Sequence, residues 1–371
     1  MQIDDFKLER YFAEHEFKVR YQLSASDCEA LAQDELLAMA DAEALALWRD
    51  LKLSYTESQG HPLLRAEAAA LHKAIRPEDV LIAAPEELIY IAMNALLRPG
   101  DHVIATFPGY QSLYTIAEAL GCSVTRWPLE VRADRWGLDL DRLAAAIRPE
   151  TRLLVVNFPH NPTGYLPSKD ELDAIIELAR RHGLHIFSDE MYRLLEYEAE
   201  TRLPPVADLY ERGISLSGLS KSFALPGLRI GWLTMRDQEL LARCVAFHDY
   251  TTICAAAPSE ILGIMALRAQ ERIIARNLRI IQHNQAEMAQ FCARHAEIFA
   301  WLPPRAGSVA FPQLRGARPV AEFCREVLDK RDVMILPGDV FDHDGNHFRV
   351  GLGRTNFPEA LAQVEAYLRE A

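Results

Sequence analysis

Six short apolar runs recur through the middle of the chain, and helical stretches separate them. The runs span Val80–Ala84, His102–Phe107, Arg152–Phe158, His185–Asp189, Ile214–Leu219 and Arg229–Met235. They are rich in Val, Ile, Leu and Phe without polar alternation, which is typical of strands covered on both faces. Strands that alternate with helices predict a largely parallel α/β sheet. Because ligands bind beyond the carboxyl ends of such strands, the residues after these runs are the first candidates for a site.

The helix between the third and fourth runs has readable ends. Ser168 and Glu171 form the pattern of a capping box, and Gly183 is a natural C-cap. Residues 258–300 then form one long helical stretch with few breakers. This stretch is expected to link the sheet to a smaller domain.

The end of the chain predicts a second, smaller α+β unit. Short strands are expected at residues 307–311, 333–336 and 348–351, with a closing helix from Pro358. A chain of 371 residues is long enough for two packed domains. The predicted division is an N-terminal arm with part of the small domain (1–45), a large domain (46–262) and a small C-terminal domain (263–371).

Charge and composition exclude several kinds of protein. The formal net charge of −13 argues against a nucleic-acid partner, because phosphate binding requires an excess of Lys and Arg. The six cysteines are scattered without a CxxC pair, which favours reduced thiols over a disulfide framework or a zinc site. The acidic N-terminus lacks the apolar region of a signal peptide, and no stretch approaches the ~20 apolar residues of a membrane span. We therefore expect a cytoplasmic enzyme without a membrane partner.

The segment from Ser215 to Gly231 carries the strongest chemical signal. Lys221 follows an apolar run among small hydroxyl residues, and Arg229 lies eight residues later between two glycines. A lysine whose pKa is lowered by burial can form a Schiff base, and an arginine can hold a phosphate. The ordinary alternative is a surface lysine at a strand end.

Two further strand ends carry polar residues. Asn161 lies in the loop Asn157–Gly164, where two X-Pro steps and a glycine predict a rigid support for its amide; the alternative is a plain turn. Asp189 ends an apolar run, where a buried carboxylate needs a cation such as a protonated pyridine nitrogen. Asp189 could instead cap the next helix. Tyr192, three residues on, is placed to reach the same ligand.

These motifs resemble the fold-type-I pyridoxal-phosphate enzymes, and in particular the class I/II aminotransferase family, from about Tyr55 to the C-terminus. The resemblance implies an aspartate aminotransferase-like fold with pyridoxal 5'-phosphate as the cofactor. It implies that Lys221 forms the Schiff base and carries the proton, that Arg229 grips the phosphate, and that Asp189 pairs with the ring nitrogen. Asn161 would bond to the phenolic oxygen and also face the substrate.

The resemblance extends to five other residues. Tyr110, in Pro108-Gly-Tyr110, would stack on the cofactor ring, although a core tyrosine is the competing interpretation. Tyr192 would reach the phenolic oxygen, and Ser220 would give a hydroxyl to the phosphate. Arg349 would clamp the substrate carboxylate, with a structural salt bridge as its alternative. Tyr55 would cross to the phosphate of a neighbouring subunit, which implies a homodimer with shared active sites.

The chain departs from the family pattern at the phosphate, which indicates a divergent subgroup. The stretch Ala83-Ala-Pro-Glu-Glu87 replaces the usual Gly-Ala or Ser-Gly-Thr turn, and Pro85 has no N–H to donate. The amides of Glu86 and Glu87 would still point outward at a helix start. Gly218 stands where many relatives carry a phosphate-binding serine.

Two further segments, one acidic and one containing two histidines, each allow more than one role. Asp27 and Glu29 lie in the arm that lines the side-chain pocket in the family. They are expected to cap the following helix, and the alternative is that they bind a cationic substrate side chain. His343 and His347 flank a glycine in an Asp-rich loop. We expect a solvated loop there and no metal site, because the glycine breaks any helix that would align the two rings.

The expected activity is amino-group transfer between an amino acid and a 2-oxo acid. The alternative is other pyridoxal-phosphate chemistry, since the pocket chooses which bond breaks: a lyase, a decarboxylase, or an arginine oxidase or cyclase of a biosynthetic pathway. A non-catalytic cofactor-binding sensor is a third class, but no basic helix-turn-helix pattern accompanies it here.

Overall fold

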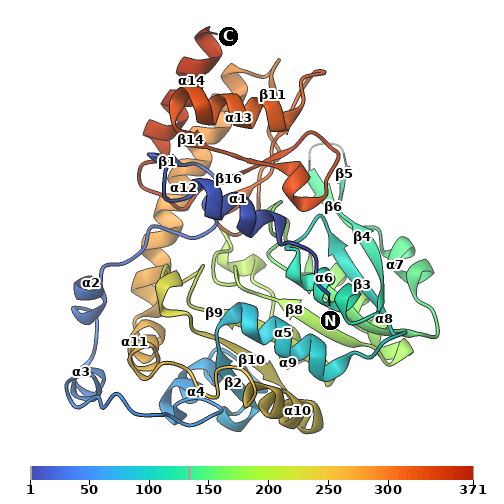
Figure 1. Cartoon of the computed structure of the whole chain (residues 1–371), viewed down its shortest axis with the longest axis vertical. Coiled ribbons are helices and arrows are strands. Elements are labelled where there is room, and N and C mark those ends of the chain that lie inside the picture. Colours follow the sequence, from blue (N-terminus) through green and yellow to red (C-terminus); the bar gives the residue numbers. More distant parts are fainter. Residues whose placement is uncertain (1, 133–134, 371) are drawn as a thin grey trace.

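The computed structural model describes residues 2–132 and 135–370. Figure 1 shows a twisted sheet with helices in one part of the molecule and a smaller group of helices and short strands in the other. The long helix α12 (Gln270–Arg294) runs from one part to the other. Within the described residues, no helix combines the length and apolar character needed to cross a membrane.

The central sheet has the strand order β2-β10-β9-β8-β7-β3-β4. The strands are β2 (Val80–Ala83), β3 (His102–Phe107), β4 (Ser123–Pro128), β7 (Thr151–Asn157), β8 (His185–Asp189), β9 (Gly213–Gly218) and β10 (Gly231–Met235). Strand β10 is antiparallel to both of its neighbours, and the other pairs are parallel. The largely parallel sheet is thus confirmed, and each of the six apolar runs forms a strand.

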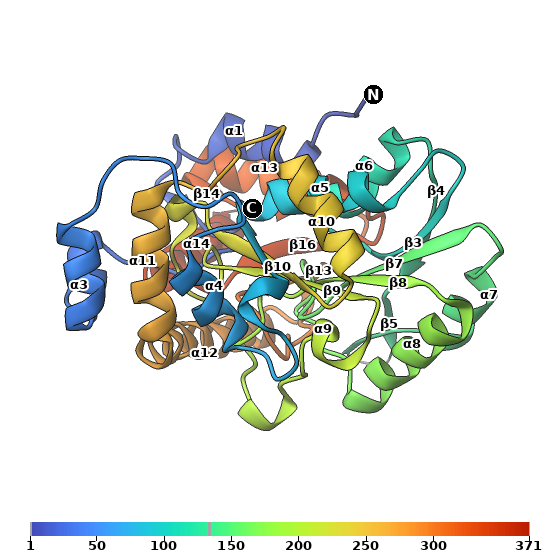
Figure 2. The ribbon, with the colours of Figure 1, turned by 90° about the horizontal axis from the view of Figure 1, so that it is seen from below.

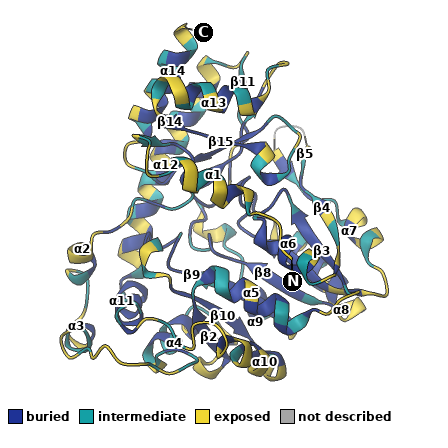
Figure 3. Cartoon of the chain, in the orientation of Figure 1, coloured by how far each residue is buried: buried dark blue, intermediate teal, exposed yellow. Residues whose placement is uncertain are grey.

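Helices cover both faces of this sheet, as the apolar runs predicted (Figure 2). One face packs against α5 (Pro85–Leu96), α6 (Ser112–Ala119) and α10 (Gln238–His248). The other face packs against α4 (Pro62–Ala69), α7 (Leu140–Ala146), α8 (Lys169–His182), α9 (Val206–Leu209) and α11 (Ala257–Arg268). Along β3, Val103 and Ala105 face the α5 side and Ile104 faces the α8 side. The strands other than the edge strand β4 are therefore buried on both sides (Figure 3).

The ends of α8 are those the sequence predicted. Ser168 Oγ accepts from the Glu171 amide at 3.2 Å, and Glu171 Oε2 accepts from the Ser168 amide at 2.7 Å. Gly183 ends the helix with φ 63°, a left-handed conformation that glycine adopts without a steric penalty.

The predicted single helix over residues 258–300 is wrong. Two helices occupy this stretch, because α11 ends at Arg268 and α12 begins at Gln270. Neither glycine nor proline marks the break at Ala269, so the pattern could not reveal it. Helix α11 packs against α3 (Ala42–Arg49) and α4, whereas α12 leads to the smaller part of the chain.

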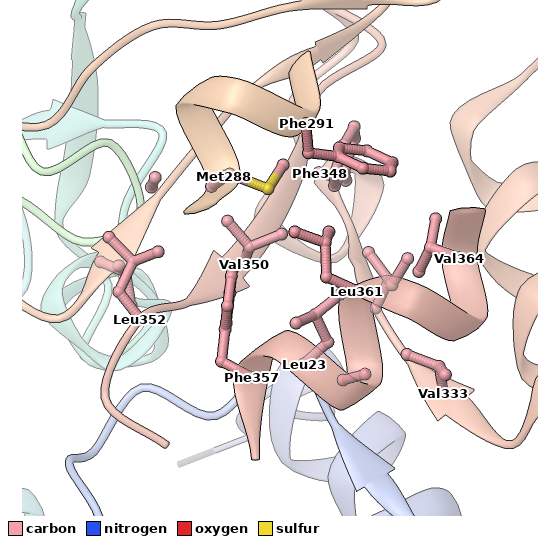
Figure 4. Close-up of a cluster of buried hydrophobic side chains, with 14 of the residues drawn as sticks. Leu23, Met288, Phe291, Val333, Phe348, Val350, Leu352, Phe357, Leu361 and Val364 are labelled. Atoms are coloured by element: carbon pink, nitrogen blue, oxygen red, sulfur yellow. The ribbon is translucent and has the colours of Figure 1, made fainter. Parts of the chain in front are cut away.

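The smaller part is an α+β unit. Its elements are α13 (Val320–Arg331), α14 (Phe357–Glu370), β11 (Phe299–Ala300), β12 (Val309–Ala310), β13 (Gln313–Leu314), β14 (Val333–Met334), β15 (Leu336–Pro337) and β16 (Phe348–Gly351). Strand β16 lies between β12 and β15. Figure 4 shows its core, in which Phe291 of α12, Val350 of β16 and Leu361 of α14 meet Leu23 of the N-terminal segment.

The N-terminal segment joins both parts. Strand β1 (Tyr21–Gln22) pairs with β14, so the start of the chain folds back onto the small part as expected. Helix α2 (Gln33–Leu37) and α3 instead pack on α11. Helix α1 (Lys7–His15) lies between the two parts (Figure 1). The division into residues 1–45, 46–262 and 263–371 remains a prediction.

The remaining short elements lie in the loops that connect the main strands and helices. They are the hairpin β5 (Glu130–Arg132) and β6 (Arg135–Gly137) and the 3-10 turns Pro77–Asp79, Ala199–Thr201, Pro226–Leu228 and Gly338–Phe341. The turn Pro226–Leu228 belongs to the connection between β9 and β10, which also carries Lys221.

Candidate active site

A cavity of about 390 Å³ opens at the carboxyl ends of β7, β8 and β9, with β16 and α1 on its other sides. This volume is within the usual range for small-molecule sites. Of the residues singled out from the sequence, those in its wall are Asp27, Pro85, Glu86, Tyr110, Asn161, Asp189, Tyr192, Ser220, Lys221, Arg229 and Arg349. The fold thus brings together side chains that are far apart in the sequence. Their individual roles remain proposals.

Lys221 follows β9 and directs its amine into the cavity. Its Nζ donates to Ser26 Oγ at 2.7 Å. Burial lowers the pKa of Lys221, and the neighbouring Asp27 partly offsets this effect. A lowered pKa leaves more of the amine neutral and therefore nucleophilic. The alternative of an ordinary surface lysine is wrong.

Asp189 ends β8 and is 6% exposed. Its Oδ1 accepts from the Met191 amide at 3.1 Å, and burial raises its pKa to about 6. Residues 191–194 form a turn, so Asp189 is not a helix cap. No ion pair to Asp189 forms within residues 2–132 and 135–370. A buried carboxylate in this condition favours a cationic ligand atom, which fits a protonated pyridine nitrogen.

Arg349 on β16 is 1% exposed and faces the loop after β7. Its Nη1 donates to Asn161 Oδ1 at 3.1 Å and its Nη2 donates to the Ser24 carbonyl at 3.0 Å. Its Nε has no hydrogen-bond partner in the described part of the chain, and no carboxylate there pairs with it. The alternative of a structural salt bridge is therefore wrong, and the guanidinium is left to bind an anion.

The loop after β7 holds Asn161 firmly. The Asn161 amide donates to Asn157 Oδ1 at 2.7 Å, and Asn157 Nδ2 donates to the Asp189 carbonyl at 2.9 Å. These bonds connect the ends of β7 and β8. The side chain of Asn161 is thereby fixed between Arg349 and the cavity.

Ser220 and two tyrosines complete the wall around Lys221. The Ser220 hydroxyl is buried without a hydrogen-bond partner among the described residues, which indicates room for a ligand acceptor. Tyr192 is buried and Tyr110 is partly buried. The Tyr110 ring lies 5.0 Å from the ring of Phe6, and its hydroxyl donates to Glu9 Oε1 at 3.4 Å.

Both departures from the family pattern lie together at the start of α5. Pro85 is the first helical residue, and its ring packs against Gly218 and Gly231. A Cβ at position 218 would lie 3.2 Å from Pro85 Cγ and 2.9 Å from Gly231 Cα. A side chain at 218 would be crowded mainly by the backbone of residues 230 and 231, and Pro85 would have to give by a few tenths of an ångström.

The two glutamates after Pro85 point in different directions. Glu86 lines the cavity, and burial raises its pKa to about 7, so the carboxyl is partly protonated near neutral pH. This lessens its repulsion of a phosphate. The side chain of Glu87 lies outside the cavity, where Oε1 accepts from the Thr252 amide at 3.2 Å and from its hydroxyl at 2.8 Å.

Two predicted residues lie at the margin. Arg229 has a left-handed backbone with φ 55°, and its Nη1 donates to the Pro226 carbonyl at 3.1 Å at the cavity edge. Tyr55 is 86% exposed and does not line the cavity of its own chain. A role for Tyr55 at a cofactor site would therefore have to lie in another subunit.

Helix α1 supplies cavity residues that the sequence reasoning missed. Leu8, Glu9, Phe12 and Glu16 all line the cavity. The spacing of residues 9, 12 and 16 places them on one helical face, which is a signal that the sequence carries. Ser26 was also missed.

The helix-capping prediction for Asp27 and Glu29 is wrong. Asp27 accepts two hydrogen bonds from Arg354 Nη2, at 2.9 and 3.0 Å, while it also lines the cavity. Glu29 accepts from the Thr355 amide at 3.1 Å. The cap position of α2 belongs instead to Ala32.

The solvated loop predicted around His343 and His347 is also wrong. His343 Nε2 and His347 Nδ1 are 3.0 Å apart, and the His347 ring stacks 5.2 Å from Phe311. Burial lowers the pKa of His347 to about 3, so the ring is neutral. No group of three or more His, Cys, Asp or Glu residues suited to a metal ion occurs in the described residues.

Comparison with known proteins places these features in a family. The model of the family described as aminotransferase class I and II matches residues 21–362. Capreomycidine synthase from Streptomyces vinaceus is 30% identical over 368 residues, covering 97% of this chain and 93% of that protein.

Two solved structures resemble the chain over its whole length. A PLP-dependent aminotransferase from Streptococcus suis 89-1591 has a TM-score of 0.93 and 29% identity, covering 100% of this chain and 99% of that chain. The PLP-dependent cyclase OrfR has a TM-score of 0.90 and 29% identity, covering 100% of this chain and 98% of that chain.

Proposed function

The chain belongs to the aminotransferase class I and II family, and from the geometry of its cavity we propose the role of each site residue. Membership confirms the predicted pyridoxal-phosphate-dependent aminotransferase, and the structural neighbours confirm the aspartate aminotransferase-like fold. The observation that supports the roles best is the meeting of Lys221, Asp189 and Arg349 in one cavity.

The residues present fit pyridoxal 5'-phosphate. Lys221 would hold it covalently, Asp189 would pair with its ring nitrogen, and Tyr110 would stack on the ring. The phenolic oxygen would meet Asn161 and Tyr192. The phosphate would meet a separate group of donors, namely Arg229, Ser220 and the amides of Glu86 and Glu87. When bound, the cofactor supplies an electron sink for the charge that develops at the substrate α-carbon.

The protein residues bind the substrate and move its proton. Arg349 binds the α-carboxylate with its free N–H groups, and Asn161 orients the guanidinium through the 3.1 Å hydrogen bond. Lys221 Nζ accepts the proton that leaves the α-carbon, which its lowered pKa permits. Ser26 Oγ, at 2.7 Å, holds this amine in place. The substrates are an α-amino acid and a 2-oxo acid.

The decisive experiment follows the absorbance of the bound cofactor. An amino-acid substrate should change the spectrum of the purified enzyme, and a 2-oxo acid should restore it. If no amino acid in a full panel changes the spectrum, the proposed roles of Lys221 and Arg349 are wrong.

We propose that the enzyme is a homodimer. Large apolar side chains are exposed next to α5 and α10: Leu53, Tyr55, Tyr90, Phe247, Tyr250 and Ile253. Ser58 Oγ donates to Asp249 Oδ1 at 2.9 Å, which brings the segment of Tyr55 next to that of Tyr250. Exposed apolar patches of this kind mark protein interfaces. A monomer in sedimentation-equilibrium measurements would contradict this proposal.

Shared active sites are testable by mixing variants. Tyr55→Phe and Lys221→Ala subunits should each be weakly active alone. If Tyr55 serves the neighbouring site, their mixed dimer contains one site with both native residues and regains activity. A cytoplasmic location is also proposed, supported by six cysteines that form no disulfide.

A cyclase of the same cofactor class is a second candidate. Capreomycidine synthase and OrfR, named as a synthase and a cyclase, match 97% and 100% of this chain. Mass spectrometry of the products decides between the candidates. Transfer yields a 2-oxo acid from the amino donor, whereas cyclisation yields a product that keeps the nitrogen.

A further inference from the structure

Helix α1 covers the cavity with an acidic face. Glu9 and Glu16 line the cavity two helical turns apart, and Phe12 lies between them on the same face. Phe12 also lies 5.8 Å from the guanidinium of Arg349. The carboxylates of α1 therefore flank the residue that binds the substrate carboxylate.

The cations of the cavity are all assigned under the proposed function, on which this inference rests. Lys221 reacts with the cofactor, Arg229 meets its phosphate, and Arg349 meets the substrate carboxylate. Asp189 is matched by the ring nitrogen. Asp27 is matched by Arg354, with oxygen–nitrogen distances of 2.9 and 3.0 Å.

Glu9 and Glu16 form no ion pair within the described residues, although Arg354 and Lys221 partly offset the rise in the pKa of Glu16. The Glu16 carboxylate forms no hydrogen bond or ion pair with any described residue, and Glu9 only accepts from the Tyr110 hydroxyl at 3.4 Å. Glu16 is partly buried, and burial, with Asp27 and Glu9 nearby, raises its pKa. Glu9 is exposed. Neighbouring carboxylates that repel one another favour the approach of a positive charge.

A second observation points to a ligand with two charged ends. Arg349 is 1% exposed, and its Nε has no partner in the described part of the chain although the residue lines the cavity. One end of the ligand must therefore be an anion. Glu9 and Glu16, beside it on α1, suit a cation at the other end.

We propose that Glu9 and Glu16 bind the positively charged side chain of the substrate. The preferred amino donor is then a basic amino acid, with a guanidinium or ammonium group at the end of an extended side chain. Charge-assisted hydrogen bonds to two carboxylates would select this class over neutral and acidic amino acids.

The experiment compares L-arginine with L-citrulline, which replaces the guanidinium by a neutral urea of nearly the same shape. The ratio of their kcat/KM values isolates the contribution of the charge. In the holoenzyme this ratio should exceed 10, and Glu16→Gln and Glu9→Gln should each lower it about tenfold. L-ornithine should be preferred over L-glutamate in the same way.

Glu14→Gln is the matched control. Glu14 lies on the same helix, is exposed and does not line the cavity. It carries the same charge, so a general field effect would change the ratio as much as Glu16→Gln does. The ratio should stay within twofold of the parent, and thermal unfolding should show that all three variants fold.

The possible outcomes distinguish failure of the basic-substrate proposal from failure of the proposed function. If amino acids react but arginine and citrulline react equally well, the basic substrate is wrong and the transfer activity stands. If the parent prefers arginine but neither Glu9→Gln nor Glu16→Gln lowers the ratio, the assignment to α1 is wrong. If no amino acid reacts, the proposed function itself fails.

Discussion

The ring of Pro85 packs against Gly218, at a position where the neighbouring backbone leaves little room for a side chain. A Cβ at Gly218 would lie 3.2 Å from Pro85 Cγ and 2.9 Å from both Gly231 Cα and the Ile230 carbonyl oxygen. This corner, which is proposed to hold the phosphate, is therefore packed by one proline and two glycines. The shape of this corner depends on the absence of side chains at Gly218 and Gly231 as much as on its hydrogen-bond donors.

Gly218→Ala should destabilise the protein by about 1–3 kcal/mol, because the added methyl group meets backbone atoms that cannot move aside easily. Chemical denaturation of the cofactor-free protein measures this change. Gly227→Ala is the control, since a Cβ at Gly227 has open space around it. Equal free energies of unfolding for the two variants would show that a methyl group fits at position 218.

Asp189→Asn should stabilise the cofactor-free protein above pH 6. Burial raises the pKa of Asp189 to about 6 in the folded protein, from an ordinary value of 3.8. The folded state therefore binds this proton more tightly than the unfolded chain does, and stability is lost as the pH rises from about 4 through about 6. The difference corresponds to about 3 kcal/mol at pH 8.

The same variant should be less stable than the parent once the cofactor is bound, because the ring nitrogen then loses its carboxylate partner. Thermal unfolding at pH 5 and pH 8, with and without pyridoxal phosphate, tests both halves of this prediction. A variant that is less stable than the parent under all four conditions would contradict it.

Lys221→Ala should abolish the covalent attachment of the cofactor and lower turnover by at least about a thousandfold, because the same amine carries the proton. Borohydride treatment followed by mass spectrometry of the intact chain detects attachment. Lys169→Ala is a suitable control, since Lys169 is an exposed residue that pairs with Asp173 on α8. Full turnover in Lys221→Ala would refute the assignment.

Arg349→Lys should raise KM for every amino acid and lower kcat/KM by about 10²-fold or more, because an ammonium group cannot form a bidentate pair with a carboxylate. Steady-state kinetics with several amino donors measures this loss. Arg294→Lys, in an exposed pair with Glu365, should leave the kinetics unchanged. A loss confined to one donor would assign Arg349 to the side chain of the substrate instead.

The sequence predicted those parts of the fold in which composition and burial agree. Strands β2, β3, β7, β8, β9 and β10 are buried on both faces, and each appears as an apolar run. The edge strand β4 was missed because it includes the exposed Ser123 and Arg126, which break such a run. The break at Ala269 was missed because neither glycine nor proline marks the point where α11 ends.

The residues of the candidate site also fall into those that the sequence predicts and those that it does not. Lys221, Asn161 and Asp189 follow apolar runs, so their convergence could be expected from the geometry of parallel sheets. The cavity face of α1 could not, because nothing local says which surface of the protein an amphipathic helix covers. The pairing of Asp27 with Arg354 joins residues 327 positions apart, and no local pattern indicates a contact at that separation.

The reversed direction of β10 has a consequence for how the site is built. Because β10 runs antiparallel to β9, residues 219–230 join the two strands at one end of the sheet without a crossover α-helix. That connection carries both Lys221 and Arg229. The spacing between Lys221 and Arg229, the proposed covalent anchor and the proposed phosphate ligand, is thus set within this one connection. An inserted residue there would shift the two anchoring points against each other while leaving the rest of the scaffold in register.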